Sequence, residues 1–346
     1  MKNISRESFS ISFTQIHLNF LSRGACFLLL LIPAMFFGCS KPMVPIDKST
    51  TAIVNSTIKS NLSESYMIKS IEAFFFEREK NGTLDCYQRI DNPQSTCTVA
   101  SGSGDRTLLI IANSNKDQYS WADIKNLKTF SEVTIDLEEE SLDTPIMSSI
   151  INTKAGEDIN LNLIPLGSQI ILRSIACDFS GKPYAHENFT LTRVYLTYVN
   201  ASCRIIPEQV TLPSRIINAG ILDEEHLKVF SQKDLIVKEF NQVVKTTTIY
   251  PNCTLYCYAN NSVVESVGTP FTKLVIEGKI GNDVYYYPIK INSENGGLSR
   301  GDMFIYDIIL TRTGSTDPDG NLNEGDIKIN MEVEAWREKD SYCVKF

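Results

Sequence analysis

Hydrophobic and polar positions alternate along much of the chain after residue 65, and this period of two is typical of half-buried β-strands. Residues 66–77 (YMIKSIEAFFFE) alternate and end on aromatic side chains, Asn81-Gly82 is a hairpin signal, and residues 83–90 return as a second strand. Residues 104–114 (GDRTLLIIANS) hold a continuous apolar run, as expected of a strand buried on both faces. Further strands are expected over 159–179, 189–206, 246–260, 271–280, 283–291, 303–314 and 326–336.

One segment has helical spacing. Ser120 with Asp123 three residues later is close to a capping box, and Ile124 and Leu127 lie on one helical face. A second helical piece is expected around residues 130–141. Many short strands and few helices predict a mostly β chain of β-sandwiches.

The expected strands fall into two groups. A polar stretch with Pro and Gly follows Pro207 and runs to about residue 245. After the first 38 residues about 300 remain, which exceeds one typical domain. We therefore predict two sandwich domains, at 65–207 and 208–346, with the short helices in the first.

The first 39 residues resemble an export signal. Residues 24–38 are almost entirely apolar, follow Lys2, Arg6 and Arg23, and are shorter than the roughly 20 residues that span a bilayer. Cys39 directly after Gly38 resembles the lipobox of bacterial lipoproteins, in which the cysteine becomes the acylated N-terminus. The alternative is an ordinary secretory signal at residues 1–38 with an incidental Cys39.

The net charge of the chain argues against nucleic acid as a partner. The whole chain has a net charge of −8, from 33 Lys and Arg against 41 Asp and Glu. Without the three basic and one acidic residue of the first 38, the totals are 30 and 40, a net charge of −10. This acidic surface argues against nucleic acid as a partner and suits a soluble surface protein.

Seven cysteines remain after Cys26 and Cys39 are set aside, so at least one has no intramolecular partner. Two hairpin-like pairs are candidate disulfides for an exported chain, although connectivity does not follow from sequence. These pairs are Cys86 with Cys97 and Cys177 with Cys203.

The search for catalytic chemistry finds no constellation. The three histidines are His17 in the signal and His186 and His226 in polar stretches. Cys253 and Cys257 are spaced C-x3-C without a second pair, so they are better explained as two core positions on one face of a strand than as a zinc site. We expect no enzyme activity, no cofactor and no metal.

One acidic stretch has calcium-like spacing. Residues 316–326 (TDPDGNLNEGD) place Asp317, Asp319, Asn321 and Asn323 at alternate positions. An EF-hand loop needs Gly at its sixth and Glu at its twelfth position, where this chain has Leu322 and Lys328. A polar hairpin turn is the preferred interpretation.

Four motifs resemble the fimbrillins, the subunits of type V pili. Residues 102–115 (GSGDRTLLIIANSN) resemble their Gly-x-Arg-Thr-Leu strand that ends in Ala-Asn. Residues 285–292 (YYYPIKIN), 303–321 (MFIYDIILTRTGSTDPDGN) and 329–336 (INMEVEAW) resemble the Tyr-Tyr-Pro, Tyr-Asp-Ile/Leu and Trp-ended strands near the family's C-terminus. The order and spacing agree from about residue 65 to the end of the chain.

The resemblance implies two tandem transthyretin-like β-sandwich domains and export as a lipoprotein to the outer membrane. A trypsin-like protease then removes a leader with its first strand, and a strand of another copy or a related fimbrial subunit fills the groove. The expected location is therefore a lipid-anchored precursor at the outer membrane and then a surface fimbrium that supports adhesion. No metal, cofactor or nucleic acid is implied.

Carried onto this chain, the leader is residues 39–64 and its strand is 50–58. Alternation sets Ala52, Val54 and Ser56 on one face and Ile53, Asn55 and Thr57 on the other, and does not decide which face is inward. Fimbrillins are typically cut after Arg, and no Arg lies between Cys39 and Arg78. Lys59 follows the leader strand and Lys48 precedes it, and Lys59 is favoured. Lys41 would leave the strand attached, and Lys69 lies within an expected core strand.

The donor segment would be the end of the chain, residues 337–346. Tyr342, Val344 and Phe346 alternate and give it one apolar face. A short last strand in the chain's own sheet is the alternative. Two other functions stay open: an anchor subunit that keeps its lipid, and a surface lipoprotein that binds glycans or other ligands without polymerising.

Overall fold

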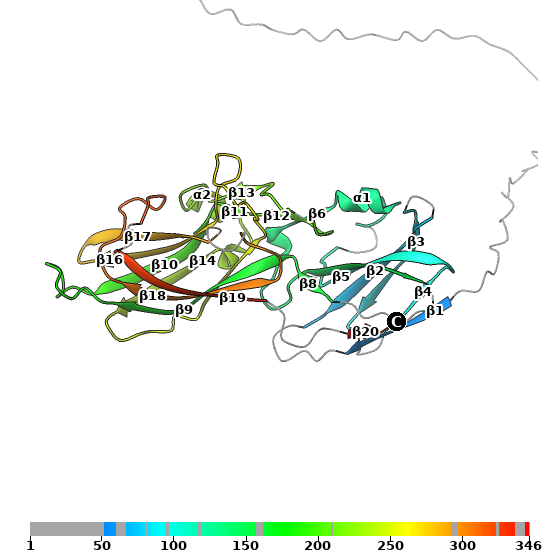
Figure 1. The fold of residues 1–346 in the computed structure, drawn as a ribbon, viewed down its shortest axis with the longest axis horizontal. Coiled ribbons are helices and arrows are strands. Elements are labelled where there is room, and N and C mark those ends of the chain that lie inside the picture. Colours follow the sequence, from blue (N-terminus) through cyan, green and yellow to red (C-terminus); the bar gives the residue numbers. More distant parts are fainter. Residues whose placement is uncertain are drawn as a thin grey trace, which may run out of the picture. The chain divides into compact units, whose positions relative to one another are not determined.

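The described chain is mostly β-structure. The computed structural model describes residues 52–59, 67–79, 82–93, 97–116, 120–154, 156, 162–208, 210–291, 297–322, 325–335 and 343–345. Figure 1 labels the elements along the chain. The strands are β1 (Ala52–Lys59), β2 (Ser70–Glu77), β3 (Leu84–Asp91), β4 (Cys97–Ser101), β5 (Asp105–Ala112), β6 (Thr134–Asp136), β7 (Met147–Lys154), β8 (Ile164–Pro165), β9 (Gly167–Cys177), β10 (Phe189–Thr197), β11 (Val199–Asn200), β12 (Ser202–Arg204), β13 (Ile216–Ile217), β14 (Val237–Val244), β15 (Cys253–Tyr258), β16 (Lys273–Ile280), β17 (Asp283–Lys290), β18 (Asp302–Leu310), β19 (Ile327–Ala335) and β20 (Cys343–Lys345).

Four larger sheets organise these strands. The first two have the orders β3-β2-β5-β7-β8 and β20-β1-β4, and the other two have the orders β14-β10-β16-β17 and β15-β9-β18-β19. Strands β9 and β18 are parallel, and the other pairings are antiparallel. Two short pairs, β11-β13 and β12-β6, complete the described sheets.

Among the described residues helices are few and short: α1 (Leu127–Ser131), α2 (Glu224–Leu227), and the 3-10 turns η1 (Leu137–Glu139) and η2 (Lys233–Leu235). The sequence predicted few short helices but placed them before residue 208, whereas α2 and η2 follow it. The prediction that the first helix begins at Ser120 is wrong. Asn126 is its N-cap, and the Asn126 side chain accepts a hydrogen bond from Thr129 N at 2.8 Å. The helix cannot begin earlier because Asn126 is extended and bridges Thr83. The second expected helical piece is β6 followed by η1.

The sheets exchange partners well before residue 207. Strands β2, β3, β5, β7 and β8 form one sheet, and β1 pairs with β4 and with the C-terminal β20. Strand β6 pairs with β12. Strands β9 and β10 precede residue 207, but they pair with β15, β18, β14 and β16, which follow it. The change lies between Pro165 and Gly167, and the division into two domains stays a prediction.

The sheet β3-β2-β5-β7-β8, called the central sheet below, belongs to the first group of strands (those before β9). Its strand β5 is buried on both faces, as the apolar run predicts. On one face Phe74 packs edge-on against Trp121 and Phe130, with ring centroids 5.3 and 4.8 Å apart. On the other face Phe75 and Leu108 belong to a separate buried cluster. Alternate residues of a strand point to opposite faces, so consecutive aromatics serve both cores.

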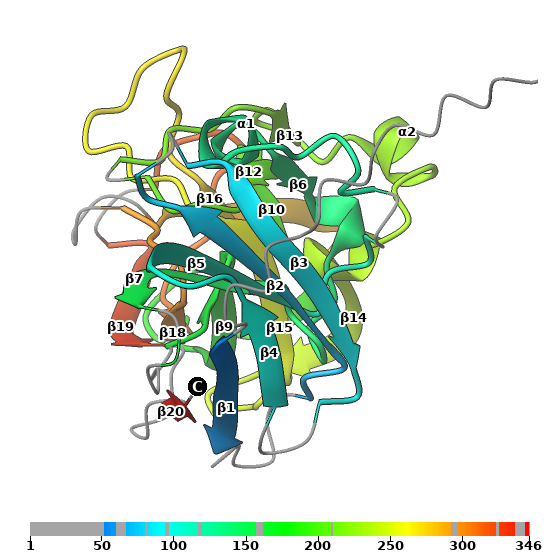
Figure 2. The same cartoon turned by 90° about the vertical axis from the view of Figure 1, so that its right-hand side faces the viewer.

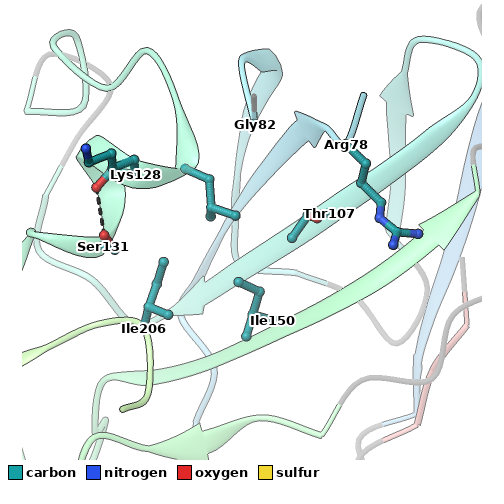
Figure 3. Close-up of a pocket in the computed structure, with 8 residues that line it drawn as sticks. Arg78, Gly82, Thr107, Lys128, Ser131, Ile150 and Ile206 are labelled. Atoms are coloured by element: carbon teal, nitrogen blue, oxygen red, sulfur yellow. Dashed lines mark hydrogen bonds between the residues drawn. The ribbon is translucent and has the colours of Figure 1, made fainter. Parts of the chain in front are cut away.

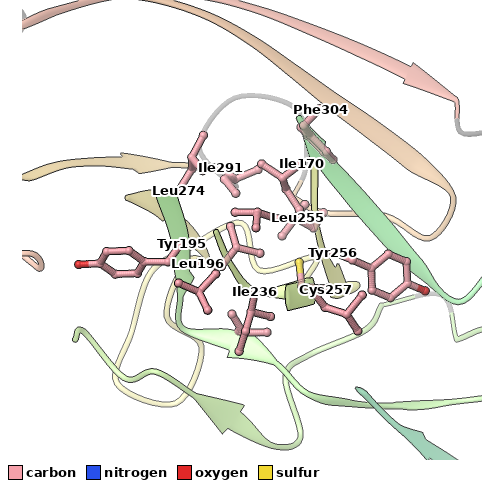
Figure 4. Close-up of a cluster of buried hydrophobic side chains, with 14 of the residues drawn as sticks. Ile170, Tyr195, Leu196, Ile236, Leu255, Tyr256, Cys257, Leu274, Ile291 and Phe304 are labelled. Carbon is pink, nitrogen blue, oxygen red and sulfur yellow. The ribbon is translucent and has the colours of Figure 1, made fainter. Parts of the chain in front are cut away.

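The later sheets enclose a larger core. Figure 4 shows Leu196, Leu255 and Ile170 directed toward one another between the strands. Gly278 of β16 permits close packing here, because a Cβ at this position would lie 2.2 Å from the ring of Phe189. This core fixes the frame on which the exposed loops described below are held.

Candidate functional site

Strand β1 is the middle strand of a three-stranded sheet, between β4 and β20 (Figure 2). It pairs with β4 from Ala52 opposite Ser101 to Ser56 opposite Cys97. It then pairs with β20 over three residues, from Thr57 opposite Lys345 to Lys59 opposite Cys343. A leader segment and the C-terminal segment, which lie at opposite ends of the sequence, therefore share one sheet.

Strand β4 connects this small sheet to an apolar cluster. Cys97 and Val99 are buried and pack with side chains of the central sheet, among them Phe75 and Ile110. The register sets Ala52, Val54 and Ser56 opposite Ser101, Val99 and Cys97 of β4, which are buried. Pairing with β1 thus shields the backbone edge of the strand that covers this cluster.

The predicted site residues are only partly described. Lys59 is the last residue of β1, and Val344 of β20 is opposite Ile58. Cys39, Lys48, Tyr342 and Phe346 lie outside the described residues. The structure thus brings the favoured cleavage residue and the donor segment together, a proximity that sequence spacing does not reveal.

The candidate disulfides are not formed in this structure. Cys86, Cys177 and Cys203 are free cysteines, so neither candidate pair is bonded, and the Cys86 thiol donates a hydrogen bond to Ala100 O at 2.8 Å. Burial raises the pKa of the Cys86 thiol to about 12 and that of Cys177 to about 11.

The cysteines with C-x3-C spacing lie in the core of β15. Cys253 and Cys257 are 1% and 0% exposed, as expected for two positions on one face of a strand. Among the described residues no cluster of three His, Cys, Asp or Glu side chains could hold a metal ion.

The calcium-like stretch is a turn held by its own acidic groups. Asp317 Oδ1 accepts from Asp319 N at 2.9 Å, as in an Asx turn. The Asp319 carboxylate contacts Lys273 Nζ at 2.5 Å and accepts from the Tyr198 hydroxyl at 2.7 Å. These carboxylates anchor the turn to β16, which agrees with the hairpin interpretation.

A pocket of about 560 Å³ lies beside α1 on the first group of strands (Figure 3). Its apolar lining comes from Leu127, Ile150 and Ile206, which are half-buried. Arg78 and Lys128 also line the pocket. Both side chains are exposed, and neither forms an ion pair with a described residue. No local pattern in the sequence indicated this pocket, because its lining comes from distant segments.

A buried acid lies where the strands exchange partners. Glu140 is 1% exposed, and its carboxylate accepts hydrogen bonds from Ile146 N at 2.9 Å and from the Tyr256 hydroxyl at 3.0 Å. The same hydroxyl accepts from Gly167 N at 2.9 Å. Burial raises the pKa of Glu140 to about 7, against the lowering effect of these hydrogen bonds.

Arg300 completes this junction. Its guanidinium donates to Ser148 Oγ at 2.8 Å and to the carbonyl oxygens of Ile205 and Ile164 at 3.2 and 3.3 Å. These groups join the loop before β18 to β7, β8 and the segment after β12. The sequence offered only isolated charged residues here, so it did not indicate a buried polar network.

A comparison with protein families matches the part of the chain that contains β1. Residues 46–164 match the family model described as "Major fimbrial subunit protein (FimA)". The resemblance to the fimbrillin family is confirmed. The matched region runs from the leader to Ile164 of β8, so it ends where the strands exchange partners.

Solved structures extend the likeness of this fimbrillin-like chain to the fold of its later strands. A putative cell adhesion protein from Bacteroides eggerthii has a TM-score of 0.62 and 15% identity, over 83% of this chain and 96% of that chain. A fimbrilin (fimA) from Porphyromonas gingivalis has a TM-score of 0.59 and 13% identity, over 83% and 98%. The tip fimbrial protein Mfa3 from the same organism has a TM-score of 0.52 and 15% identity, over 82% and 98%.

At these identities the solved structures show a common fold. No curated protein matches the chain in sequence. None of the described helices is long and apolar enough to cross a membrane.

Proposed function

We propose that the chain is a structural subunit of a cell-surface fimbria, assembled by donor-strand exchange and supporting adhesion. The observation that carries this proposal is the position of β1 between β4 and β20. The family match over residues 46–164 supports it, because that region includes β1 and every strand of the sheet that β4 covers.

Removal of β1 would create an acceptor. Lys59 is the last residue of β1, so a cut by a trypsin-like protease after Lys59 removes the whole strand. The edge of β4 then loses its backbone partners over Cys97–Ser101. An unpaired edge above an apolar cluster is a template for a strand from another subunit, which supplies main-chain hydrogen bonds and alternating side chains.

The same cut would free a donor. Among the described strands β20 pairs only with β1, so loss of β1 leaves it without a strand partner. We assign the donor role to this end of the chain, with Tyr342, Val344 and Phe346 as the inserting positions. Contact between two different surfaces of successive copies does not close on itself and yields a filament.

Export would precede this exchange. A lipid on Cys39 holds the precursor at the outer membrane, and the leader prevents assembly until the protease acts.

We also propose that the chain has two sandwich domains. Their boundary lies at residues 165–167, where the strands exchange partners, instead of at residue 207.

An anchor subunit that keeps its lipid is the second candidate. The absence of Arg between Cys39 and Arg78 favours it, because fimbrillins are typically cut after Arg. A glycan-binding lipoprotein has less support. Trp121 is 4% exposed and packs on Phe130, so it is not available to stack on a sugar.

The test is N-terminal mass spectrometry of the protein recovered from intact cell surfaces. A new N-terminus after Lys59 and multimer ladders on unheated gels are expected. Lys59→Gln should abolish both, whereas Lys69→Gln, at an exposed lysine just before β2, should preserve them. A mature chain that still starts at acylated Cys39 refutes the polymerising subunit and leaves the anchor.

A further inference from the structure

The loop between β15 and β16 exposes three valines. Val263, Val264 and Val267 are 72%, 71% and 102% exposed. Val210 and Leu212, also exposed, lie next to this loop, because Asn261 N donates to Thr211 O at 2.9 Å. Clustered apolar exposure of this kind marks an interaction surface more often than scattered single residues do.

The valine loop, residues 262–269, is held in one shape by its own hydrogen bonds. Thr269 N donates to Ser266 Oγ at 3.2 Å, and Ser266 N donates to Thr269 O at 3.3 Å. Thr269 Oγ1 donates to Val264 O at 3.2 Å, and Lys290 Nζ binds Glu265 at 2.7 Å. Such a preformed turn loses little conformational entropy when it binds, while its valines gain from leaving water.

The pocket beside α1 has the complementary character. Its volume of about 560 Å³ is ample for two valine side chains, and Leu127, Ile150 and Ile206 offer apolar contact. Figure 3 shows Arg78 and Lys128 on opposite sides of Ile150 and Ile206. Two cations without a described ion-pair partner, in a chain of net charge −8, favour a partner that carries an acidic group among apolar ones.

We propose that the valine loop of one copy docks in the pocket beside α1 of a second copy. The loop sequence Val-Val-Glu-Ser-Val supplies both requirements, since Glu265 lies between the valines that fill the apolar part. Glu265 then faces the cations of the pocket while it keeps Lys290 at its other side. This contact joins two different surfaces, so it can repeat from copy to copy.

The contact goes beyond strand exchange and does not require it. It buries side chains of a loop and a pocket, whereas strand exchange pairs the backbone edge of β4. Together they would join successive subunits at two separate contacts, which fixes their orientation more tightly than strand exchange alone.

Photo-cross-linking on intact cells tests the proposal. One copy of the full chain carries p-benzoylphenylalanine in place of Val264, and a co-expressed copy carries a distinguishable tag. Cross-links to peptides that contain Leu127–Ser131, Ile150 or Ile206 of the tagged copy are expected. The same probe in place of Val229, which is 80% exposed on another loop, should give no such cross-links.

A charge reversal in the tagged copy provides the second measurement. Lys128→Glu should lower the cross-link yield about tenfold, in the range of a lost interfacial charge pair. Lys125→Glu, also exposed but outside the pocket lining, should leave the yield unchanged. Absence of the cross-link, its location elsewhere, or equal yields for the two variants overturns the proposal.

The multimer ladder is read from the same samples. Loss of the ladder with retained cross-links would count against strand exchange alone. A retained ladder without cross-links would count against the loop contact alone, so the two failures are distinguishable.

Discussion

Replacement of Glu140 by Gln should remove a pH dependence of folding. In the folded chain burial raises the pKa of Glu140 to about 7 from an ordinary value of 4.5. Between these two values the folded state keeps the proton while the unfolded state releases it. The free energy of unfolding therefore falls as pH rises from about 4.5 to 7 and stays low above that range. A difference of this size corresponds to about 3 kcal/mol.

The glutamine of the Glu140→Gln variant has the shape of the protonated acid and cannot ionise. The Glu140 oxygen that faces Tyr256 can donate to the Tyr256 hydroxyl once it is protonated, and the glutamine amide can donate in the same way while its oxygen accepts from Ile146 N. The free energy of unfolding of Glu140→Gln, relative to the natural chain, should therefore rise by about 3 kcal/mol between pH 4.5 and about pH 8.

Urea unfolding at a series of pH values, followed by near-ultraviolet circular dichroism, measures this difference. Glu132→Gln is the matched control, because the Glu132 side chain is 67% exposed. A pH dependence that both variants share would not be assigned to the burial of Glu140. A Glu140→Gln difference that stays constant over the whole pH range would refute the assignment of a buried, proton-holding carboxyl at this junction.

Three further predictions concern the core and the turn. Phe75→Ala should lower the free energy of unfolding, measured by urea denaturation, by about 3–5 kcal/mol, because it leaves a cavity in the cluster that includes Cys97 and Val99 of β4. The Cys177 thiol, whose pKa is raised to about 11 by burial, should react with Ellman's reagent only after denaturation, and fast reaction of the folded chain would contradict its burial. Asp319→Ala should cost about 3–5 kcal/mol, because it leaves Lys273 buried without its carboxylate. Glu225→Ala, which removes a surface pair, should cost at most about 1 kcal/mol by the same assay, and similar losses for both would refute the distinction.

Local patterns predicted the strands well. The alternation of residues 66–77 and the continuous apolar run of 104–114 correspond to β2 and β5, because strand periodicity is a local consequence of which faces are buried. The helix start at Ser120 failed for the opposite reason. The extended pairing of Asn126 with Thr83 is a contact between distant segments, and it overrides a local capping signal.

The candidate assembly site, the sheet β20-β1-β4, could be predicted only in part from the sequence. Sequence pointed to a β-prone leader and an alternating C-terminus, but it carried no indication that β1 pairs with both β4 and β20. It also could not choose the inward face of β1, because a strand of mixed small and polar residues has no strong hydrophobic bias. The structure sets Ala52, Val54 and Ser56 opposite Ser101, Val99 and Cys97 of β4, a pairing that depends on contacts between distant segments.

By itself, then, the sequence determined the β-rich class, the acidic surface and the fimbrillin resemblance, since each depends on residue types, their period and short motifs. Only the tertiary structure decided that strands exchange partners after Pro165, that Glu140 is buried against Tyr256, and that three exposed valines and a basic-rimmed apolar pocket occur on one chain. These features arise from contacts between residues far apart in sequence. Their free energies depend on burial and on neighbouring charges, which no local pattern encodes.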